Sequence, residues 1–253
     1  MATVLTGFTV SLVLGVPIGT FIAAYVDWRY IYMILAIATL ITLIMLIRLV
    51  PKKPGNSSLP LKQQLYILRD KRLVAGLFTT IFWILGYTML FAYIAPFLSE
   101  RADFSIEQIS TALFILGVFA FIGSRFGGYA VDRWGPFKTI TSSLAIHAVA
   151  LFTLFFTASS TIGVLLTLMV WGAATWTTTP ANQYYLISLQ PNSSEIVLSF
   201  HTALMNIGMT LGAGLGGTVI AYTSIIHLSW IGCLMVIVAL LAAITSFRLR
   251  YNP

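Results

Sequence analysis

Long apolar stretches alternate with short breaks that hold most of the charged residues of this chain. A membrane-spanning helix needs about 20 mostly apolar residues. Eight stretches meet that length: 4–25, 31–50, 74–97, 109–129, 139–157, 161–187, 197–221 and 228–247. They do not alternate with the period of two that barrel strands show, so the pattern predicts helices. We therefore expect an all-α fold, a polytopic membrane bundle of eight transmembrane helices.

Composition supports a membrane protein and narrows the chemistry. Of the 253 residues, 58% are hydrophobic and 8% are charged, whereas a soluble domain is about 25% charged. The single cysteine, Cys233, cannot form an internal disulfide. No spacing of Cys and His predicts a metal site, so no metal and no other cofactor are expected. No Ser, His and acidic residues cluster as a nucleophile and base would, so an enzyme is not expected.

The placement of the charges predicts an orientation in the cell membrane. Twelve of the fourteen Lys and Arg residues fall in or beside alternate breaks, within 48–72, 125–138 and 248–250. By the positive-inside rule those breaks are cytoplasmic, and so are both termini. The alternative reading of the +7 net charge is a basic surface for nucleic acid. Because the charges flank the spans, topology explains them better and no nucleic-acid partner is expected.

The one long break divides the chain into three parts. Residues 51–60, "PKKPGNSSLP", have the composition of a linker. Residues 61–72 repeat Leu61, Leu65 and Leu68 at helical spacing, which predicts a short amphipathic helix on the inner membrane surface. We therefore expect two spans in 1–50, a basic cytoplasmic linker in 51–73, and six spans in 74–253.

Two spans carry small residues at every fourth position, which lets neighbouring helices approach closely in lipid. The stripes consist of Gly7, Ser11, Gly15, Gly19 and Ala23 in the first span, and Gly208, Gly212 and Gly216 in the seventh. Pro17 should bend the first span. Plain helix packing explains both stripes, and a sliding contact between moving helices is the functional alternative.

Aromatic and polar residues near mid-membrane depth suggest the lining of a pocket for an organic ligand. The candidate cavity residues are Trp83, Tyr87, Trp171, Thr175, Gln183 and Asn206. Asn206 belongs to a polar stripe, Ser199, Thr202, Asn206 and Thr210, opposite the glycines of its span. Ordinary packing is the competing explanation for any single residue. His147 also lies mid-depth; we expect it to bond a neighbour such as Ser143, and a proton-carrying role is the alternative.

Five segments resemble members of the major facilitator superfamily. "GYAVDRWGPFK", Gly128 to Lys138, resembles its G-x-x-x-D-R-x-G loop. "LGVPIGTF", Leu14 to Phe21, resembles the fifth-helix motif of drug/proton antiporter-type exporters and contains Gly15, Pro17 and Gly19. "YIAPFL", "WGAATWTTTPANQYYL" and "SFHTALMNIGMTLGAGLGG" look most like bacterial purine nucleoside/base and sugar efflux transporters.

The resemblance implies a partial major facilitator fold. The eight spans would be helices five to twelve: the last two helices of an N-terminal half and a complete C-terminal half. In the loop motif, Gly127, Gly128, Asp132, Arg133, Gly135 and Lys138 would form a cytoplasmic gate. Pro136 and Phe137 stand where the family usually has basic residues.

The implied function is proton-coupled efflux of a small organic solute, such as a purine, nucleoside, sugar or drug-like molecule, by alternating access. A rocking mechanism needs two halves, so we expect a truncated or split product, with a second chain supplying the missing helices. No Asp or Glu lies at mid-depth in any span, so the proton carrier would lie in those helices. The alternative from another class is a non-transporting membrane scaffold, an assembly subunit or an inactive fragment.

Overall fold

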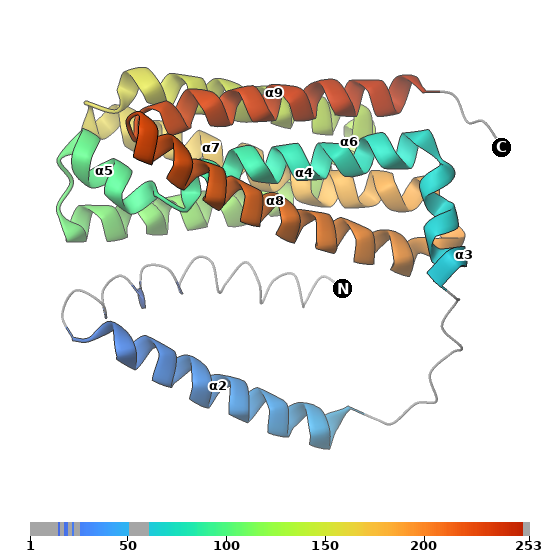
Figure 1. Ribbon diagram of the computed structural model, residues 1–253, viewed down its shortest axis with the longest axis horizontal. Helices are drawn as coiled ribbons and strands as arrows, with labels where there is room; N and C mark the ends of the chain where they lie inside the picture. The colour runs from blue at the N-terminus through green and yellow to red at the C-terminus, as the bar shows by residue number, and fades with distance from the viewer. Residues whose placement is uncertain (1–14, 16–17, 20–21, 23–25, 51–60, 250–253) are drawn as a thin grey trace.

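The computed structural model describes residues 15, 18–19, 22, 26–50 and 61–249. The regular elements in these residues are all helical, as the hydrophobic pattern predicted, and α4 to α9 form one bundle (Figure 1). In chain order they are α2 (Trp28–Leu49), α3 (Leu61–Tyr66), η1 (Ile67–Arg69), α4 (Lys71–Phe91), α5 (Ile94–Ala102), α6 (Ile106–Thr157), α7 (Thr161–Leu189), η2 (Pro191–Ser193), α8 (Ser194–Tyr222) and α9 (His227–Arg248). Most of the first expected span, with Pro17, and the linker 51–60 lie outside the described residues.

Helix α6 joins two expected spans without the loop that the sequence predicted at 130–138. At about 1.5 Å per residue, its 52 residues would extend roughly 78 Å if straight. Gly135 breaks the helix with φ 78° and ψ 165°, a conformation open almost only to glycine. Pro136 then starts the second arm, where its missing N–H costs nothing. The expected loop was wrong because one glycine and one proline suffice to turn the chain.

The third expected span, 74–97, was also wrong at its end. Helix α4 stops at Phe91, and α5 begins at Ile94. Pro96 has no N–H to donate to Ala92, and its ring would collide with that carbonyl in a continuous helix. Tyr93 fixes the break, because its hydroxyl donates to the Ala213 carbonyl of α8 at 2.9 Å. The chain therefore turns two residues after α4 ends.

Helix α4 lies inside the bundle, packed against α7, α8 and α9. The glycine stripe of α8 faces it: an added Cβ at Gly208, Gly212 or Gly216 would lie 2.8, 2.6 or 2.8 Å from a backbone carbonyl oxygen of α4. Gly86 of α4 and Gly232 of α9 make a similar crossing, where a Cβ on Gly86 would lie 2.6 Å from the Gly232 carbonyl oxygen. Close packing of the α8 stripe, expected from its spacing, is confirmed.

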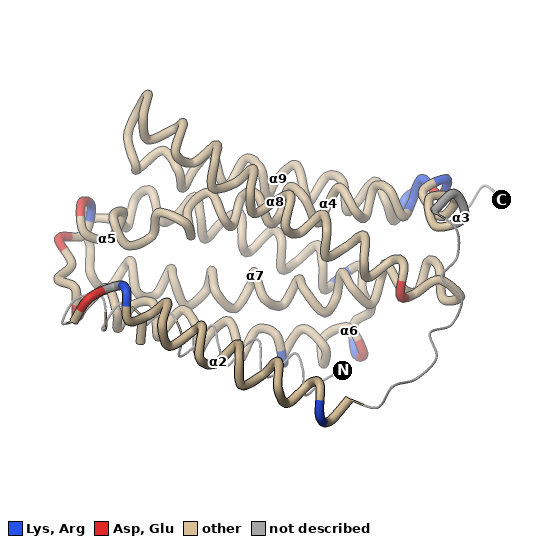
Figure 2. The backbone as a smooth tube through the Cα atoms, turned by 60° about the horizontal axis from the view of Figure 1, so that its bottom comes forward, with Lys and Arg blue, Asp and Glu red and all other residues tan. Residues whose placement is uncertain are grey.

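Six described helices are long and apolar enough to cross a membrane, and α6 supplies two spans through its arms. Helix α2 is exposed along its length and lies apart from the bundle (Figure 1). Most charged residues lie toward the two ends of the bundle, and few lie between them (Figure 2). One end carries the basic residues Arg69, Lys71, Arg72 and Arg248, as the charge pattern predicted.

The expected amphipathic helix of the linker is present but short. Helix α3 spans six residues and continues into one turn of 3₁₀ helix. Leu65 is exposed, Leu68 is half-buried, and Ile67 is the buried residue of this segment. The leucine spacing therefore predicted the position of the helix correctly, but it did not identify Ile67 as the side chain that packs into the bundle.

Candidate functional site

An aromatic cluster occupies the space where α4, the first arm of α6 and α7 meet. The Tyr87 ring lies 5.2 Å from Trp171, 6.5 Å from Trp176 and 5.0 Å from Phe91, measured between ring centroids. Tyr87 and Trp171 are 5% and 1% exposed. Two of the six candidate cavity residues, which come from different spans, are therefore in direct ring contact.

Trp171 is fixed by a bond that the sequence did not predict. Its indole Nε1–H donates to Nε2 of His147 at 2.8 Å. The expected partner, Ser143, bonds Thr178 at 2.8 Å instead. Because an indole only donates, Nε2 of His147 must be unprotonated, and the neutral ring carries its hydrogen on Nδ1. The expected bond from His147 to Ser143 was wrong, because His147 bonds the indole of α7, which packs directly against α6, and Ser143 bonds Thr178 of the same helix.

The cavity at the cluster is small in this conformation. About 10 Å³ is open between Tyr87, Phe91 and Trp176 on one side and Leu113, Leu116, Gly117 and Ala120 of α6 on the other. That space suits about one water, whereas pockets for organic ligands measure about 300–1,000 Å³. A solute would therefore need the helices to separate before it could bind here.

Several polar groups around the cluster have no hydrogen-bond partner among the described residues. They include the indole N–H of Trp83 and the hydroxyl of Thr175, both fully buried. One turn beyond Thr178, by contrast, Asn182 donates to Thr80 of α4 at 2.8 Å. A buried polar group without a partner costs about 1–3 kcal/mol, so Trp83 and Thr175 are available to a ligand that brings matching groups.

The other two candidate cavity residues lie away from the cluster. Gln183 is half-buried on α7. Asn206 is exposed on α8, and its amide donates to the Thr202 carbonyl one turn earlier at 2.9 Å. Ser199, Thr202 and Thr210 make the same kind of bond within α8. The polar stripe of α8 thus faces outward from the bundle while its glycines face α4.

The residues of the expected gate line the turn between the two arms of α6. Gly127 packs against α7, where an added Cβ would lie 2.5 Å from the Thr177 carbonyl oxygen, whereas a Cβ on Gly128 would meet nothing within 4 Å. Asp132, Arg133 and Lys138 are exposed. Arg133 donates to the Tyr129 hydroxyl at 3.1 Å. Added Cβ atoms on Gly15 and Gly19 of the exporter motif would also meet nothing within 4 Å.

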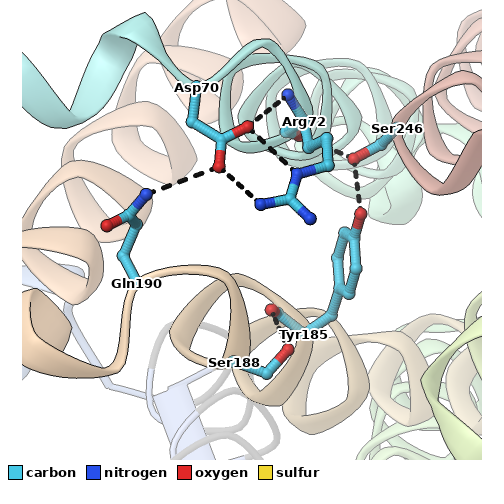
Figure 3. Close-up of polar contacts among 6 residues, drawn as sticks. All are labelled: Asp70, Arg72, Tyr185, Ser188, Gln190 and Ser246. Atoms are coloured by element: carbon cyan, nitrogen blue, oxygen red, sulfur yellow. Dashed lines mark hydrogen bonds and ion pairs between the residues drawn. The ribbon is translucent and has the colours of Figure 1, made fainter. Parts of the chain in front are cut away.

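A polar network ties three helix ends together on the basic side of the bundle (Figure 3). Asp70 caps α4 by accepting from the Arg72 backbone N–H at 2.9 Å, and it pairs with the Arg72 guanidinium at 2.9 Å. Ser246 of α9 donates to the Arg72 carbonyl at 2.6 Å. The Ser246 hydroxyl has one hydrogen, so the Tyr185 hydroxyl of α7, 2.9 Å away, must donate to it.

The network also sets the ionisation of Asp70. Burial alone would raise the pKa of this carboxyl, but the bonds and charge of Arg72 and the Leu73 backbone N–H outweigh burial and hold the pKa below 3.8. The charge pattern of the linker did not predict this role of Asp70. An Asp directly before an apolar span is a helix-capping signal and could have revealed this role.

His201 is a second residue that the sequence analysis missed. It is 0% exposed on α8, and neither ring nitrogen has a hydrogen-bond partner among the described residues. One histidine in an apolar span gives no signal of burial, since its face depends on the rotation of the helix. No group of three or more His, Cys, Asp or Glu side chains that could hold a metal occurs in the described part of the chain.

Comparisons with known proteins agree with this architecture. Residues 1–195 match the profile described as Major Facilitator Superfamily. The chain is 34% identical over 248 residues to the uncharacterized MFS-type transporter YbcL of Bacillus subtilis (strain 168), covering 98% of this chain and 64% of the relative. It is 30% identical over 241 residues to the uncharacterized MFS-type transporter YtbD of the same organism, covering 93% of this chain and 61% of that relative.

The chain thus spans less than two thirds of the length of these two relatives. The profile covers well over half of its residues, and six described helices are long and apolar enough to cross a membrane. The chain belongs to the Major Facilitator Superfamily.

Proposed function

We propose that this protein exports a small organic solute across the cell membrane by proton-coupled alternating access. The observation that carries the proposal is the aromatic cluster of Tyr87, Trp171 and Trp176 at the junction of three helices. Flat rings favour stacking on a flat solute such as a purine, a nucleoside or a drug-like molecule, or on the apolar face of a sugar.

The proposed cycle begins from the conformation described above. With about 10 Å³ open beside Tyr87, the cluster is closed. Rocking of the six-helix part against a second set of helices would widen the site toward one side of the membrane at a time. Those further helices would come from the same polypeptide or from a second chain. The exposed stripe of α8, including Asn206, would face them.

Proton coupling and orientation belong to the same proposal. The basic end of the bundle would lie in the cytoplasm, with both termini there. His147 accepts a hydrogen bond from Trp171, so protonation of Nε2 would break that bond. We therefore assign the proton carrier to a residue outside α4–α9, and the solute to the cluster inside it.

Export can be tested with one representative of each solute class. Cells expressing the chain would be loaded with labelled hypoxanthine, guanosine, arabinose or ethidium, and efflux measured with and without a protonophore. We expect one class to leave faster than from empty-vector cells, and the protonophore to abolish the difference. Equal efflux of all four from both cell types would refute the proposed export.

Variants then test the cluster. Tyr87→Leu removes the ring that contacts both Trp171 and Trp176, and should lower affinity for the exported solute by about 5-fold or more, since an aromatic pair contributes about 0.5–1.5 kcal/mol beyond its buried area. Phe152→Leu, an exposed aromatic on the outer face of α6, is the matched control. Equal losses in both variants would remove the cluster from the site.

A non-transporting scaffold or assembly subunit is the second candidate. The observation that favours a scaffold is the exposure of α2 and of the α8 polar stripe, which a partner protein could cover. A scaffold would bind its partner with the cluster closed. Fluorescence quenching of the buried tryptophans by hypoxanthine or ethidium in purified protein separates the two functions. Only a transporter requires the solute to bind at the cluster and so to quench these tryptophans.

A further inference from the structure

A groove opens on the outer side of the bundle, beside the turn of α6. We name it the kink groove: it measures about 280 Å³ and lies between the two arms of α6 and α7. Its lining includes Phe126, Ala130, Trp134, Ser142, Ile146 and Ala173. Phe126, Trp134 and Ile146 are 44%, 48% and 48% exposed, so the groove is open to the surroundings of the bundle and is separate from the aromatic cluster.

The groove has hydroxyl groups in its wall, but their hydrogens are committed to the protein. Thr139 donates to the Gly135 carbonyl at 2.9 Å, and Ser142 donates to the Thr139 carbonyl at 3.2 Å. Thr177 lies 2.8 Å from the Ala173 carbonyl and 3.1 Å from the Gly123 carbonyl, and has one hydrogen to donate. The wall therefore offers few donors to a polar solute, and an apolar chain fits it better.

Two basic residues adjoin groove-lining residues in the chain: Arg133 precedes Trp134, and Lys138 precedes Thr139. Arg133 follows groove-lining Phe126 and Ala130 by seven and three residues, so it continues their helix face. Lys138 precedes Ser142 by four residues and continues the face of the second arm. Gly135 turns the chain between them, and both side chains are exposed. Each arm of α6 therefore carries one exposed basic residue beside the turn, at this end of the groove.

Aromatic residues orient this end of the groove for a membrane interface. Trp134 packs edge-on against Phe126, with ring centroids 5.7 Å apart, and Arg133 bonds the Tyr129 hydroxyl. Trp and Tyr side chains concentrate at the level of lipid headgroups. Asp132 is also exposed on this turn, but it projects about 100° round the helix from Arg133. Asp132 therefore does not neutralise the positive charge of Arg133 beside the groove.

We propose that the kink groove binds an anionic phospholipid. One acyl chain lies along the groove, and the headgroup phosphate sits between Arg133 and Lys138. Neither the kink groove nor the neighbouring hollow of about 340 Å³, lined by Ala145, Val149 and Val170 among others, has a charged residue in its lining, but only the kink groove is lined by Trp134 and Thr139, which directly adjoin Arg133 and Lys138 in the chain. That hollow takes an acyl chain of any phospholipid without preference for the headgroup, and so provides an internal comparison.

Native mass spectrometry of the full chain tests the headgroup. Protein released from nanodiscs of equal phosphatidylglycerol and phosphatidylcholine, with identical acyl chains, should retain phosphatidylglycerol preferentially. Arg133→Gln and Lys138→Gln should each lower that preference by about 5-fold, from about 1 kcal/mol per basic residue near an anionic surface. The charge-matched pair Arg125→Gln with Arg248→Gln should leave it unchanged. The proposal would be overturned if the control pair lost as much preference as the Arg133 and Lys138 variants, or if the wild type showed no preference.

Photo-crosslinking tests the acyl chain without any variant. Phosphatidylglycerol with a diazirine in one acyl chain would be irradiated in the same nanodiscs and the modified peptides mapped. We expect the modification to concentrate on residues 119–146 and 169–177, above the level on α2 and α9. Modification spread evenly over all exposed apolar faces would reject a lipid at the groove.

Discussion

At the scale of single residues, the indole–imidazole bond satisfies one of the two ring nitrogens of the buried His147, while Nδ1 has no hydrogen-bond partner among the described residues. Trp171→Phe removes the donor and leaves Nε2 of His147 without a partner. We expect a loss of about 0.5–2 kcal/mol in unfolding free energy, the range found for hydrogen bonds between membrane helices. Equilibrium unfolding of wild type and variant in a mild detergent, followed by tryptophan fluorescence, would measure the loss in unfolding free energy.

A double-mutant cycle isolates that bond from the loss of ring area. His147→Phe removes the acceptor, and the combination with Trp171→Phe removes both polar groups. The double variant should be more stable than the sum of the single losses predicts, because no orphaned group is left. Strict additivity would mean that the 2.8 Å contact contributes nothing to stability.

Asp70 gives a residue-level prediction about pH. Its pKa in the folded protein is below the ordinary 3.8, so folding favours the ionised form. The stabilisation is complete above about pH 4 and is lost as pH falls through the lowered pKa of the folded state. Asp70→Asn keeps a good helix cap but removes the charge. The melting temperatures of wild type and variant should differ most near pH 7 and converge as the pH falls below 3.8.

If the melting temperatures of wild type and variant differed by the same amount from pH 7 to pH 3, the ion pair of Asp70 with Arg72 would not be the source of the stabilisation. Asp132→Asn, which removes an exposed carboxylate, is the control for the loss of one negative charge as such.

At the scale of helices, glycines decide which faces meet. An added Cβ on Gly212 would lie 2.6 Å from the Leu85 carbonyl oxygen and 3.0 Å from Cβ of Thr88. Backbone cannot yield there as a flexible side chain would. Gly212→Ala should therefore lower the unfolding free energy by about 1–3 kcal/mol, although alanine is the better helix former. Thermal aggregation of detergent-purified protein would measure the change.

Gly214 provides a matched control two residues away on the same helix. A Cβ there meets nothing within 4 Å and is exposed, so Gly214→Ala should leave stability unchanged or raise it. A larger loss at Gly214 than at Gly212 would contradict the packing of α8 on α4.

The same helices show what the sequence could and could not predict. Periodic apolar runs located α7, α8 and α9 to within about three residues, because span length and flanking breaks are local properties. The joined α6 and the early end of α4 depended on Gly135 and Pro96, single residues inside apolar runs. The partner of His147 depended on the rotation of two helices about their axes, which no local pattern fixes.

The candidate cavity residues illustrate the same limit. Tyr87 and Trp171 were grouped because both are aromatic and mid-depth, and their rings do meet. Asn206 was grouped with them for its polarity, yet the glycines opposite it turn the other face of α8 toward α4. Chemistry and depth can be read along one helix, whereas the neighbour of each face requires the packed bundle.

At the scale of the whole molecule, the unequal charge of the two ends makes orientation testable. The basic end holds the start of α4 and the end of α9, with Arg69, Lys71, Arg72 and Arg248, while the other end holds the end of α5 and the start of α6, with Glu100, Asp103 and Glu107. Replacing the buried Cys233 by serine gives a background without cysteine. We expect a membrane-impermeant maleimide to label Glu100→Cys in intact cells, because positive charge retains the other end in the cytoplasm. Ser193→Cys, at the start of α8, should react only after permeabilisation. The reverse pattern would show that the basic end faces outward, and it would place the proposed lipid site at Arg133 and Lys138 in the outer leaflet.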